Sequence, residues 1–295
     1  MVVLTVGKSY IDIDGYASGI AYRELLTMQG ISVKFVSNAV TNSSVTKSLL
    51  NLPYGIDDYK VNSDDKFILL DFSNPNFIPE FVDIGKVIEV IDHHPGYEDY
   101  WDNSVIEEIG AVATIIVERY QKCGLLNKMK KEIALLLMAA ILDNTLNFTA
   151  KITSDRDRNA YKLLQDISKE YNFAEKYFLE CQKCIEADLK TSINNDMKIE
   201  YVNDIIPDVF GQLTIWDIKK ILDNKSEIYS IMNSYGNKWI INIISLKDNI
   251  SYILYSDSIV KSKLEKLFNC RGEDYLIIKP ALIRKEVMKK AKEVI

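Results

Sequence analysis

Acidic side chains stand where the predicted strands of this sequence end. Asp12 and Asp14 follow the buried pattern of residues 2–6, Asp71 closes FILLD, and Asp92 closes VIEVID. Ligands of open parallel sheets bind outside the carboxyl ends of the strands. A single Asp there is ordinarily a helix N-cap, but three clusters in register repel one another unless cations neutralise them. The pattern predicts a site for divalent metals that would clamp the oxygens of a phosphoryl transfer.

The histidines strengthen this prediction. The chain has only two, His93 and His94, and they are adjacent and directly follow Asp92. A neutral imidazole ligates metal ions, and its neighbour would donate a hydrogen bond or a proton to a phosphate oxygen. Two consecutive histidines at a strand end therefore favour metal ligation and phosphate contact over ordinary packing.

The elements that must position these side chains follow an alternating pattern. Residues 2–6, 32–36, 67–71 and 86–91 are typical of buried strands, and residues 111–123 and 129–142 of helices. Alternation of this kind predicts an α/β fold with a parallel, doubly wound sheet covered on both faces.

A change of pattern near residue 190 predicts a domain boundary. Residues 154–190 are charged and helical, and a second strand-rich stretch begins near residue 198. We expect an N-terminal domain over residues 1–190 and a smaller C-terminal α/β domain over 191–295, with the active site in the cleft between them.

Length and composition are consistent with two domains. The chain has 295 residues, 47% hydrophobic and 26% charged, which is globular composition. Its longest apolar run, residues 133–142, is half of the roughly 20 residues that a bilayer span needs. No signal peptide is expected, and four irregularly spaced cysteines favour reduced thiols in the cytoplasm. A net charge of −6 argues against nucleic acid as a general partner, but not against an anionic substrate at a metal.

Longer motifs carry a resemblance to a known family. VIDHHPG resembles the signature of the DHH phosphoesterase superfamily, and GKSYIDIDGYASGIAY, FILLDFSNP and MAAILDNTLNFTAKITSDRD resemble its first, second and fourth motifs. GAVATII is similar to its Gly-rich helix start. EADLK, FGQLTIWD and IKPALIRKEV resemble the second DHH-associated domain of manganese-dependent (family II) inorganic pyrophosphatases and related exopolyphosphatases. The resemblance covers nearly the whole chain.

The resemblance implies hydrolysis of a phosphoanhydride, such as pyrophosphate or polyphosphate, by metal-activated water. It implies a DHH phosphoesterase domain, a substrate-binding domain and a homodimer. By match, the metal ligands are Asp12, Asp14, Asp71 and His93, the catalytic residues are His94 and Asp92, and the substrate phosphates contact His94, Lys190, Arg284 and Lys285. We add Lys8 to the catalytic residues as a hypothesis, because its charge would stabilise the transition state. Arg supplies a planar fork to phosphate oxygens and Lys a mobile point charge.

Two positions depart from the pyrophosphatase pattern. A metal-binding His of the first motif is Lys8 here, and an Asp of the fourth motif is Asn144, with Asp143 one residue earlier. On a helix that shift turns a side chain by about 100°. The changes make the protein more positive by two charges, the charge of one divalent cation. We therefore hypothesise that Lys8 replaces the first metal and that one ion remains, with Asn144 or a reoriented Asp143 completing its site.

Several alternatives stay open from the sequence. The ion would be Mn²⁺ by resemblance, with Mg²⁺ or Co²⁺ as alternatives. The substrate could instead be a phosphomonoester or a short oligonucleotide, and the altered site could bind a phosphate ligand without turning it over. Tyr10 lies inside the predicted phosphate loop, and we interpret the Cys181-x-x-Cys184 spacing as structural thiols rather than half a zinc site.

Overall fold

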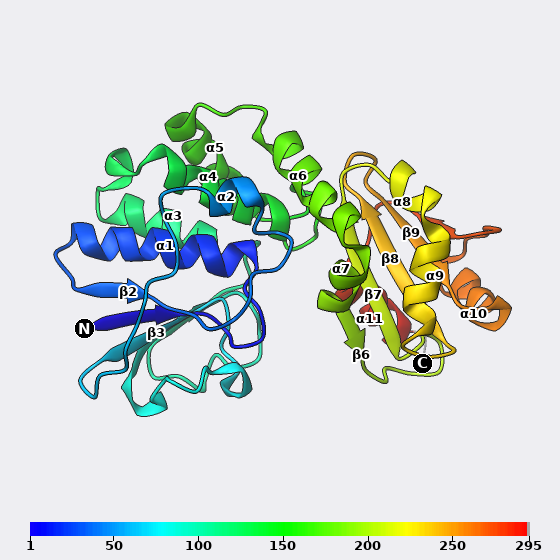
Figure 1. Cartoon of the computed structure of the whole chain (residues 1–295), viewed down its shortest axis with the longest axis horizontal. Coiled ribbons are helices and arrows are strands. Elements are labelled where there is room, and N and C mark those ends of the chain that lie inside the picture. The colour runs from blue at the N-terminus through cyan, green and yellow to red at the C-terminus, as the bar shows by residue number, and fades with distance from the viewer. Residues whose placement is uncertain (294–295) are drawn as a thin grey trace. The chain divides into compact units, whose positions relative to one another are not determined.

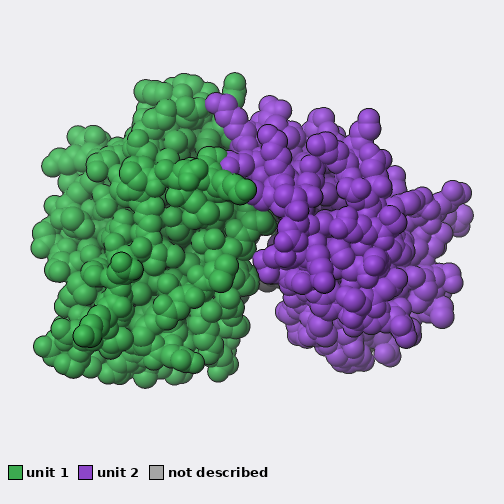
Figure 2. Space-filling view, in the orientation of Figure 1, with its two compact units in different colours: residues 1–174 green, residues 175–295 purple. Residues whose placement is uncertain are grey.

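The computed structural model describes residues 1–293, and the chain divides into two compact units. The first comprises residues 1–174 and the second runs from residue 175 to the C-terminal end (Figure 2). The boundary predicted near residue 190 thus falls inside the second unit. The functional assignment of domains 1–190 and 191–295 stays a prediction, and each unit is described by itself below.

The first unit contains a five-stranded sheet in which every neighbouring pair is parallel. The strand order is β2-β1-β3-β4-β5. The strands are β1 (Val2–Thr5), β2 (Val33–Phe35), β3 (Lys66–Leu70), β4 (Val87–Asp92) and β5 (Ser104–Ile106). The central strands are nearly continuous runs of buried apolar residues, as a sheet covered on both faces requires. This confirms the predicted parallel sheet.

Helices gather on one face of that sheet, where α1, α3 and α4 pack on one another (Figure 1). The α-helices of this unit are α1 (Ile13–Met28), α2 (Lys47–Leu50), α3 (Val112–Lys122), α4 (Lys131–Asn144) and α5 (Asp155–Ser168). The 3₁₀ turns are η1 (Pro75–Phe77), η2 (Ile84–Lys86) and η3 (Leu126–Lys128). On the other face, Phe67 packs with Tyr59 and Phe81 of the connecting loops, so loops and short turns cover that side.

The second unit contains a mixed sheet with the order β10-β9-β8-β7-β6. β7 and β8 are parallel and the other neighbours are antiparallel. The strands are β6 (Met197–Ile199), β7 (Val209–Ile215), β8 (Trp239–Ser245), β9 (Ile250–Tyr255) and β10 (Leu276–Ile278). This confirms the predicted second α/β sheet.

The central strand β8 is buried along its whole length, because each face of this sheet carries an apolar layer. The helices are α6 (Phe173–Ala187), which spans the boundary between the units, α7 (Leu189–Asn195), α8 (Lys219–Asp223), α9 (Lys225–Asn233), α10 (Ser258–Phe268) and α11 (Arg284–Lys292). No helix in the described residues has the length and apolar character needed to cross a bilayer.

Candidate metal and phosphate site

Three neighbouring strands bring the predicted acidic residues to one edge of the first unit's sheet. β1, β3 and β4 lie side by side, so the loops after them meet. Asp12 follows β1 and caps α1, where its Oδ1 accepts a hydrogen bond from the backbone N–H of Gly15 at 3.0 Å. Asp71 follows β3, and Asp92 ends β4. A cavity of about 330 Å³ opens there, and Asp12, Asp71, Asp92 and His94 form part of its lining.

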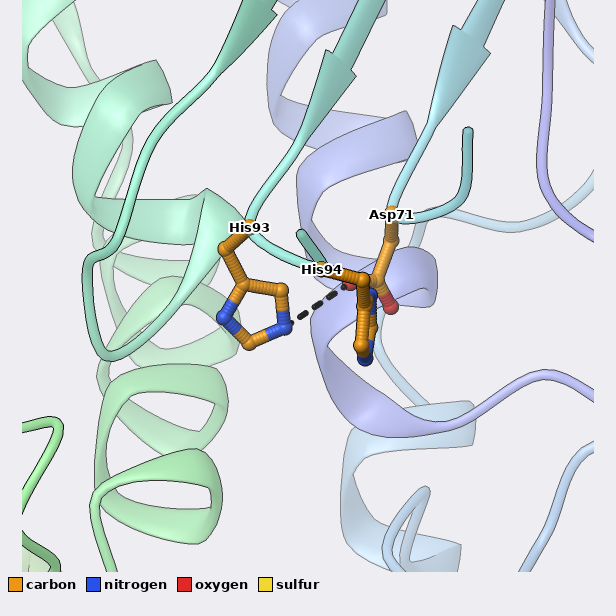
Figure 3. A group of neighbouring side chains, drawn as sticks. All are labelled: Asp71, His93 and His94. Carbon is orange, nitrogen blue, oxygen red and sulfur yellow. Dashed lines mark ion pairs between the residues drawn. The ribbon is translucent and has the colours of Figure 1, made fainter. Parts of the chain in front are cut away.

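Asp71, His93 and His94 form a group of potential metal-ligand atoms (Figure 3). One ligand atom of each lies within 4.8 Å of the others. The Nδ1 of His93 lies 3.0 Å from the backbone oxygen of Ile109 and donates to it, so a neutral ring presents its Nε2 lone pair on the other side. That Nε2 lies 3.4 Å from Oδ1 of Asp71.

The position of Asp71 fits a metal ligand. Its Oδ1 is buried and has no hydrogen-bond donor among the described residues, although His93 stands in ion-pair geometry to it. Its backbone φ of 64° lies in the left-handed region, which Asp tolerates better than most residues and which is common at functional sites. A buried carboxylate oxygen and an oriented imidazole are a donor set that suits a divalent transition metal.

The electrostatics of the site favour added positive charge. Burial raises the pKa of Asp71 well above its usual range, and the charges of Asp12 and Asp14 raise it further. Burial lowers the pKa of His93, but the close contact with the Asp71 carboxylate and its charge, with the charge of Asp14, outweigh burial and raise that pKa to about 10. In the metal-free protein a proton on His93 therefore neutralises charge that a cation would otherwise balance.

Asp92 orients the exposed histidine. Its fully buried Oδ1 accepts hydrogen bonds from the backbone N–H groups of His93 (2.7 Å) and His94 (3.1 Å) and from Nδ1 of His94 (2.8 Å). Burial raises the pKa of Asp92, yet the hydrogen bond and charge of His94 and a hydrogen bond from Ser73 lower it overall. The His94 side chain is 61% exposed and lines the cavity, so Asp92 leaves its Nε2 available to a ligand.

Asp14 is satisfied by protein donors. It is fully buried, and it accepts hydrogen bonds from the backbone N–H groups of Val112 (2.8 Å) and Ala113 (2.9 Å) at the start of α3, and from the Ser18 hydroxyl (3.3 Å). Asn144, the last residue of α4, turns its amide nitrogen to Oδ2 of Asp14 at 2.6 Å. The anion thus lies at a helix N-terminus, a favourable position for it.

The group formed by Asp71, His93 and His94 includes neither Asp14 nor Asp143, and Asn144 contacts Asp14 through its amide nitrogen. Asp143 precedes Asn144 on α4 and is partly buried. The roles of all three as metal ligands therefore stay predictions.

Lys8 is placed away from the carboxylates. Its backbone N–H donates to the backbone oxygen of Phe77 at 2.9 Å, but its side chain is exposed and is not part of the cavity lining. Within the described residues no acidic group lies within ion-pair distance of its ammonium. The hypothesis that Lys8 stands in for a metal gains no support from these contacts.

The predicted substrate cations lie in the second unit. Lys190 is exposed on α7. Arg284 begins α11, where its guanidinium pairs with the Asp196 carboxylate and donates to the backbone oxygens of Asp196 (2.6 Å) and Phe210 (3.1 Å). Arg284 therefore ties α11 to the end of α7 and to β7. The side chain of Lys285 lies outside the described part of the structure. Contact of these residues with a substrate stays a prediction.

One residue that supports the site was missed from the sequence. Asp157 is fully buried and accepts hydrogen bonds from the Gly110 N–H (3.1 Å), the Thr114 hydroxyl (2.7 Å) and the Ser154 hydroxyl (2.7 Å). Gly110 leaves no room for a side chain, because a Cβ there would lie 2.8 Å from Oδ2 of Asp157. This glycine follows Ile109, which accepts from His93, so Asp157 fixes the loop that orients the histidine. The Ser154-x-x-Asp157 capping box was the available signal.

Known proteins resemble this chain over most of its length. Residues 2–141 match the family described as "DHH family, N-terminal domain". This stretch, a little under half of the chain, is thus similar to the N-terminal domain of DHH family proteins. A "Manganese-dependent inorganic pyrophosphatase" of Methanothrix thermoacetophila is 24% identical over 99% of this chain and 96% of the relative. A "Probable manganese-dependent inorganic pyrophosphatase" of Thermotoga maritima is 28% identical over 75% of this chain, and the match spans only 42% of that longer relative.

A solved structure shows the same fold. The crystal structure of a putative family II inorganic pyrophosphatase of Methanococcus jannaschii superposes with a TM-score of 0.66 at 21% identity, over 98% of this chain and 99% of that chain. The two α/β sheets of this chain thus have a fold like that of the solved structure.

Proposed function

We propose that this protein hydrolyses a phosphoanhydride, such as pyrophosphate or polyphosphate, with water activated by a divalent metal. The observation that carries the proposal is the buried Oδ1 of Asp71 facing the oriented Nε2 of His93. Similarity to manganese-dependent pyrophosphatases at about a quarter identity supports the same chemistry and favours Mn²⁺, with Mg²⁺ or Co²⁺ as alternatives.

The residues that would hold the ion are Asp71 and His93, with Asp12 at the same sheet edge. When bound, the metal would lower the pKa of a water molecule and polarise a phosphoryl oxygen. Asp14 would keep the α1–α3 contact in place rather than contribute a ligand, because protein donors already occupy it.

His94 would act on the substrate. Asp92 fixes its Nδ1, so its exposed Nε2 can donate to a phosphate oxygen or to the leaving group. Lys190, Arg284 and Lys285 would neutralise charge on the substrate phosphates. Arg284 could do so only with the guanidinium donors that its pairing with Asp196 leaves over.

The test is a phosphate-release assay across pyrophosphate, tripolyphosphate, phosphomonoesters and short oligonucleotides, under Mn²⁺, Mg²⁺ and Co²⁺. Bound metal is counted in parallel by mass spectrometry. We expect one ion per chain, and two tightly bound ions would overturn the single-ion hypothesis. Ligand-induced stabilisation without product under every metal would identify a binding protein instead of an enzyme.

Three variants separate the roles. Asp71→Asn should lose the bound ion and nearly all activity. His94→Gln should keep the ion and lower kcat by roughly 10²–10⁴-fold, the usual contribution of a general acid or base. Asp83→Asn, at an exposed turn of the same unit, is the matched control and should change neither quantity. Retention of full activity in Asp71→Asn would contradict the assignment.

We also propose a cellular location and an oligomeric state for this protein. No disulfide joins the four cysteines of the described chain, and we propose a cytoplasmic setting, where thiols stay reduced. The resemblance to pyrophosphatases favours a homodimer, and sedimentation analysis of the purified chain tests it.

A further inference from the structure

The strand β6 forms an open edge of the second unit's sheet. It pairs with β7 on one side, and no strand of the described chain lies on its other side (Figure 1). An open edge presents backbone N–H and C=O groups with which another chain can pair, so proteins usually protect such strands with charges, twists or a covering element. The side chains along β6 therefore decide whether another chain can pair with it.

Alternate residues of β6 direct their backbone groups away from the sheet. The N–H of Glu200 donates to the backbone oxygen of Asp208 at 3.0 Å, and the N–H of Gln212 donates to that of Asp196 at 3.3 Å. In an antiparallel pair, residues that bond to the neighbouring strand alternate with residues whose N–H and C=O groups face away from it. The residues whose backbone groups face away are therefore Met197, Ile199 and Tyr201.

The side chains of these outward-bonding residues form an apolar row. Ile199 is 64% exposed and Tyr201 is 67% exposed. Met197 lies on the same face of the strand, because side chains alternate between the two faces, and it packs partly buried against an apolar layer of this unit. A second strand beside β6 would cover the exposed part of this row.

The charged residues of β6 make this edge complementary to itself. Lys198 and Glu200 alternate with the apolar row, and their exposed side chains form an ion pair at 2.6 Å. When a second copy pairs antiparallel about Ile199, Lys198 of each chain lies opposite Glu200 of the other. A pair centred on residue 198 or 200 would instead oppose two lysines or two glutamates, which destabilises a strand pair. The charges thus favour the pairing centred on Ile199.

The backbone groups fit the same pairing. With the two-fold axis at Ile199, Met197 lies opposite Tyr201 of the other chain, and Ile199 lies opposite its own copy. These are the residues whose N–H and C=O groups face outward, so each opposed pair can exchange two hydrogen bonds. A Lys on an edge strand ordinarily prevents pairing, but here Glu200 of the second copy faces it and removes the repulsion.

We infer that a second copy of this chain pairs with β6, antiparallel and centred on Ile199, so that the two copies join their second-unit sheets into one. The contact is independent of the proposed hydrolysis. Because β6 has only three residues, the strand pairing itself covers less than the roughly 1,200–2,000 Å² of a stable interface. The association is therefore weak and depends on the protein concentration.

Reversal of the charges tests the pairing, with sedimentation velocity of the full chain measured over a range of concentrations. Lys198→Glu opposes glutamates at both charged pairs, and Glu200→Lys opposes lysines at both. Each variant alone should associate at least about tenfold more weakly than the natural chain. A mixture of the two variants should associate again, because every Glu of one chain then faces a Lys of the other.

Two further proteins serve as controls. The double variant Lys198→Glu/Glu200→Lys restores opposite charges within one chain and should associate like the natural protein. Lys225→Glu reverses one partner of an exposed ion pair with Asp274 elsewhere in the second unit, and it should leave the association unchanged. Circular dichroism of each variant checks that it is folded.

A natural chain that stays monomeric at every concentration would overturn the inference. Association that is equally strong in the natural chain and in both single variants would overturn it too, while leaving open a homodimer through another surface. Weakening in both single variants without recovery in their mixture would refute the antiparallel pairing about Ile199.

Discussion

The change Asn144→Asp places a carboxylate where an amide now donates to a buried carboxylate. The Nδ2 of Asn144 lies 2.6 Å from Oδ2 of Asp14, which is fully buried and has a pKa raised chiefly by burial. In the variant, two carboxyl groups would face each other at that distance. Without a cation, one of them must hold a proton or the α1–α4 contact must open.

The magnitude follows from the two effects that the change combines. Loss of a hydrogen bond to a charged group costs about 1.5–3 kcal/mol. Two like charges 4 Å apart repel by about 4 kcal/mol at an effective dielectric constant of 20, and proton uptake relieves part of that. We expect the metal-free variant to lose about 2–4 kcal/mol of stability, a large share of the roughly 5–15 kcal/mol of a typical protein. A cation bound between the two carboxylates would attract both, so the variant would then gain stability instead of losing it.

Calorimetric unfolding in EDTA measures the loss of stability without metal, and unfolding in increasing Mn²⁺ measures its recovery. Binding at a hundred times Kd restores about 2.7 kcal/mol, so the variant should recover its melting temperature in Mn²⁺ and bind one more ion than the natural chain. Asn144→Ala is the control, because it loses the hydrogen bond without adding charge, and added metal should stabilise it no more than it stabilises the natural chain. The reasoning is refuted if Asn144→Asp is no less stable than the natural chain in EDTA, or if Mn²⁺ stabilises both equally.

Three further predictions follow from other contacts. Asp157→Asn should weaken Mn²⁺ binding about tenfold, because it loosens the loop that orients His93. Asp257→Asn, which removes a similar helix cap at α10, should leave Mn²⁺ binding unchanged. Equal metal affinities in the two variants would leave Asp157 a purely structural role. Lys8→His added to Asn144→Asp should raise the metal count and pyrophosphatase activity above those of Asn144→Asp alone, and unchanged values would count against the first-metal hypothesis. Burial raises the pKa of Asp65, but the Tyr59 hydroxyl and the N-terminal amine lower this pKa overall. The ionised Asp65 carboxylate therefore stabilises the fold above about pH 4, and this stabilisation is lost in more acid solution. Asp65→Asn should cost about 1–3 kcal/mol of unfolding free energy at pH 7 and progressively less below pH 4, as urea unfolding can measure.

The strand ends were the most predictable part of the site. A residue that closes a buried parallel strand has a fixed place at the carboxyl edge of the sheet, so Asp71 and Asp92 could be placed together from sequence alone. The apolar helix α4 was predicted for a similar reason, because a helix apolar on all sides must be buried. Short elements such as β5 and α7 gave no comparable signal, since three to seven residues rarely show a resolvable period.

The direction in which a polar side chain points could not be predicted. Sequence suggested that Asn144 would offer its carbonyl to a metal, whereas the structure turns its amide nitrogen to Asp14. Sequence likewise placed Lys8 at the site by its position in the motif, yet its long side chain reaches solvent. Both outcomes depend on donors supplied by α3 and on loop geometry, which are distant in sequence.

The positions of Lys8 and Asn144 bear on the number of metal ions that the site would bind. The two substitutions add two positive charges along the motifs, but only Asn144 lies against a carboxylate, so only one of these changes acts within the site. Asp14 already accepts hydrogen bonds from four donors, and Oδ1 of Asp92 accepts from His93 and His94, although its buried Oδ2 has no donor among the described residues. Asp12 and Asp71 are the carboxylates assigned to the proposed ion, and they carry two negative charges when ionised. A single divalent cation would neutralise both, so the contacts favour one ion without any contribution from Lys8.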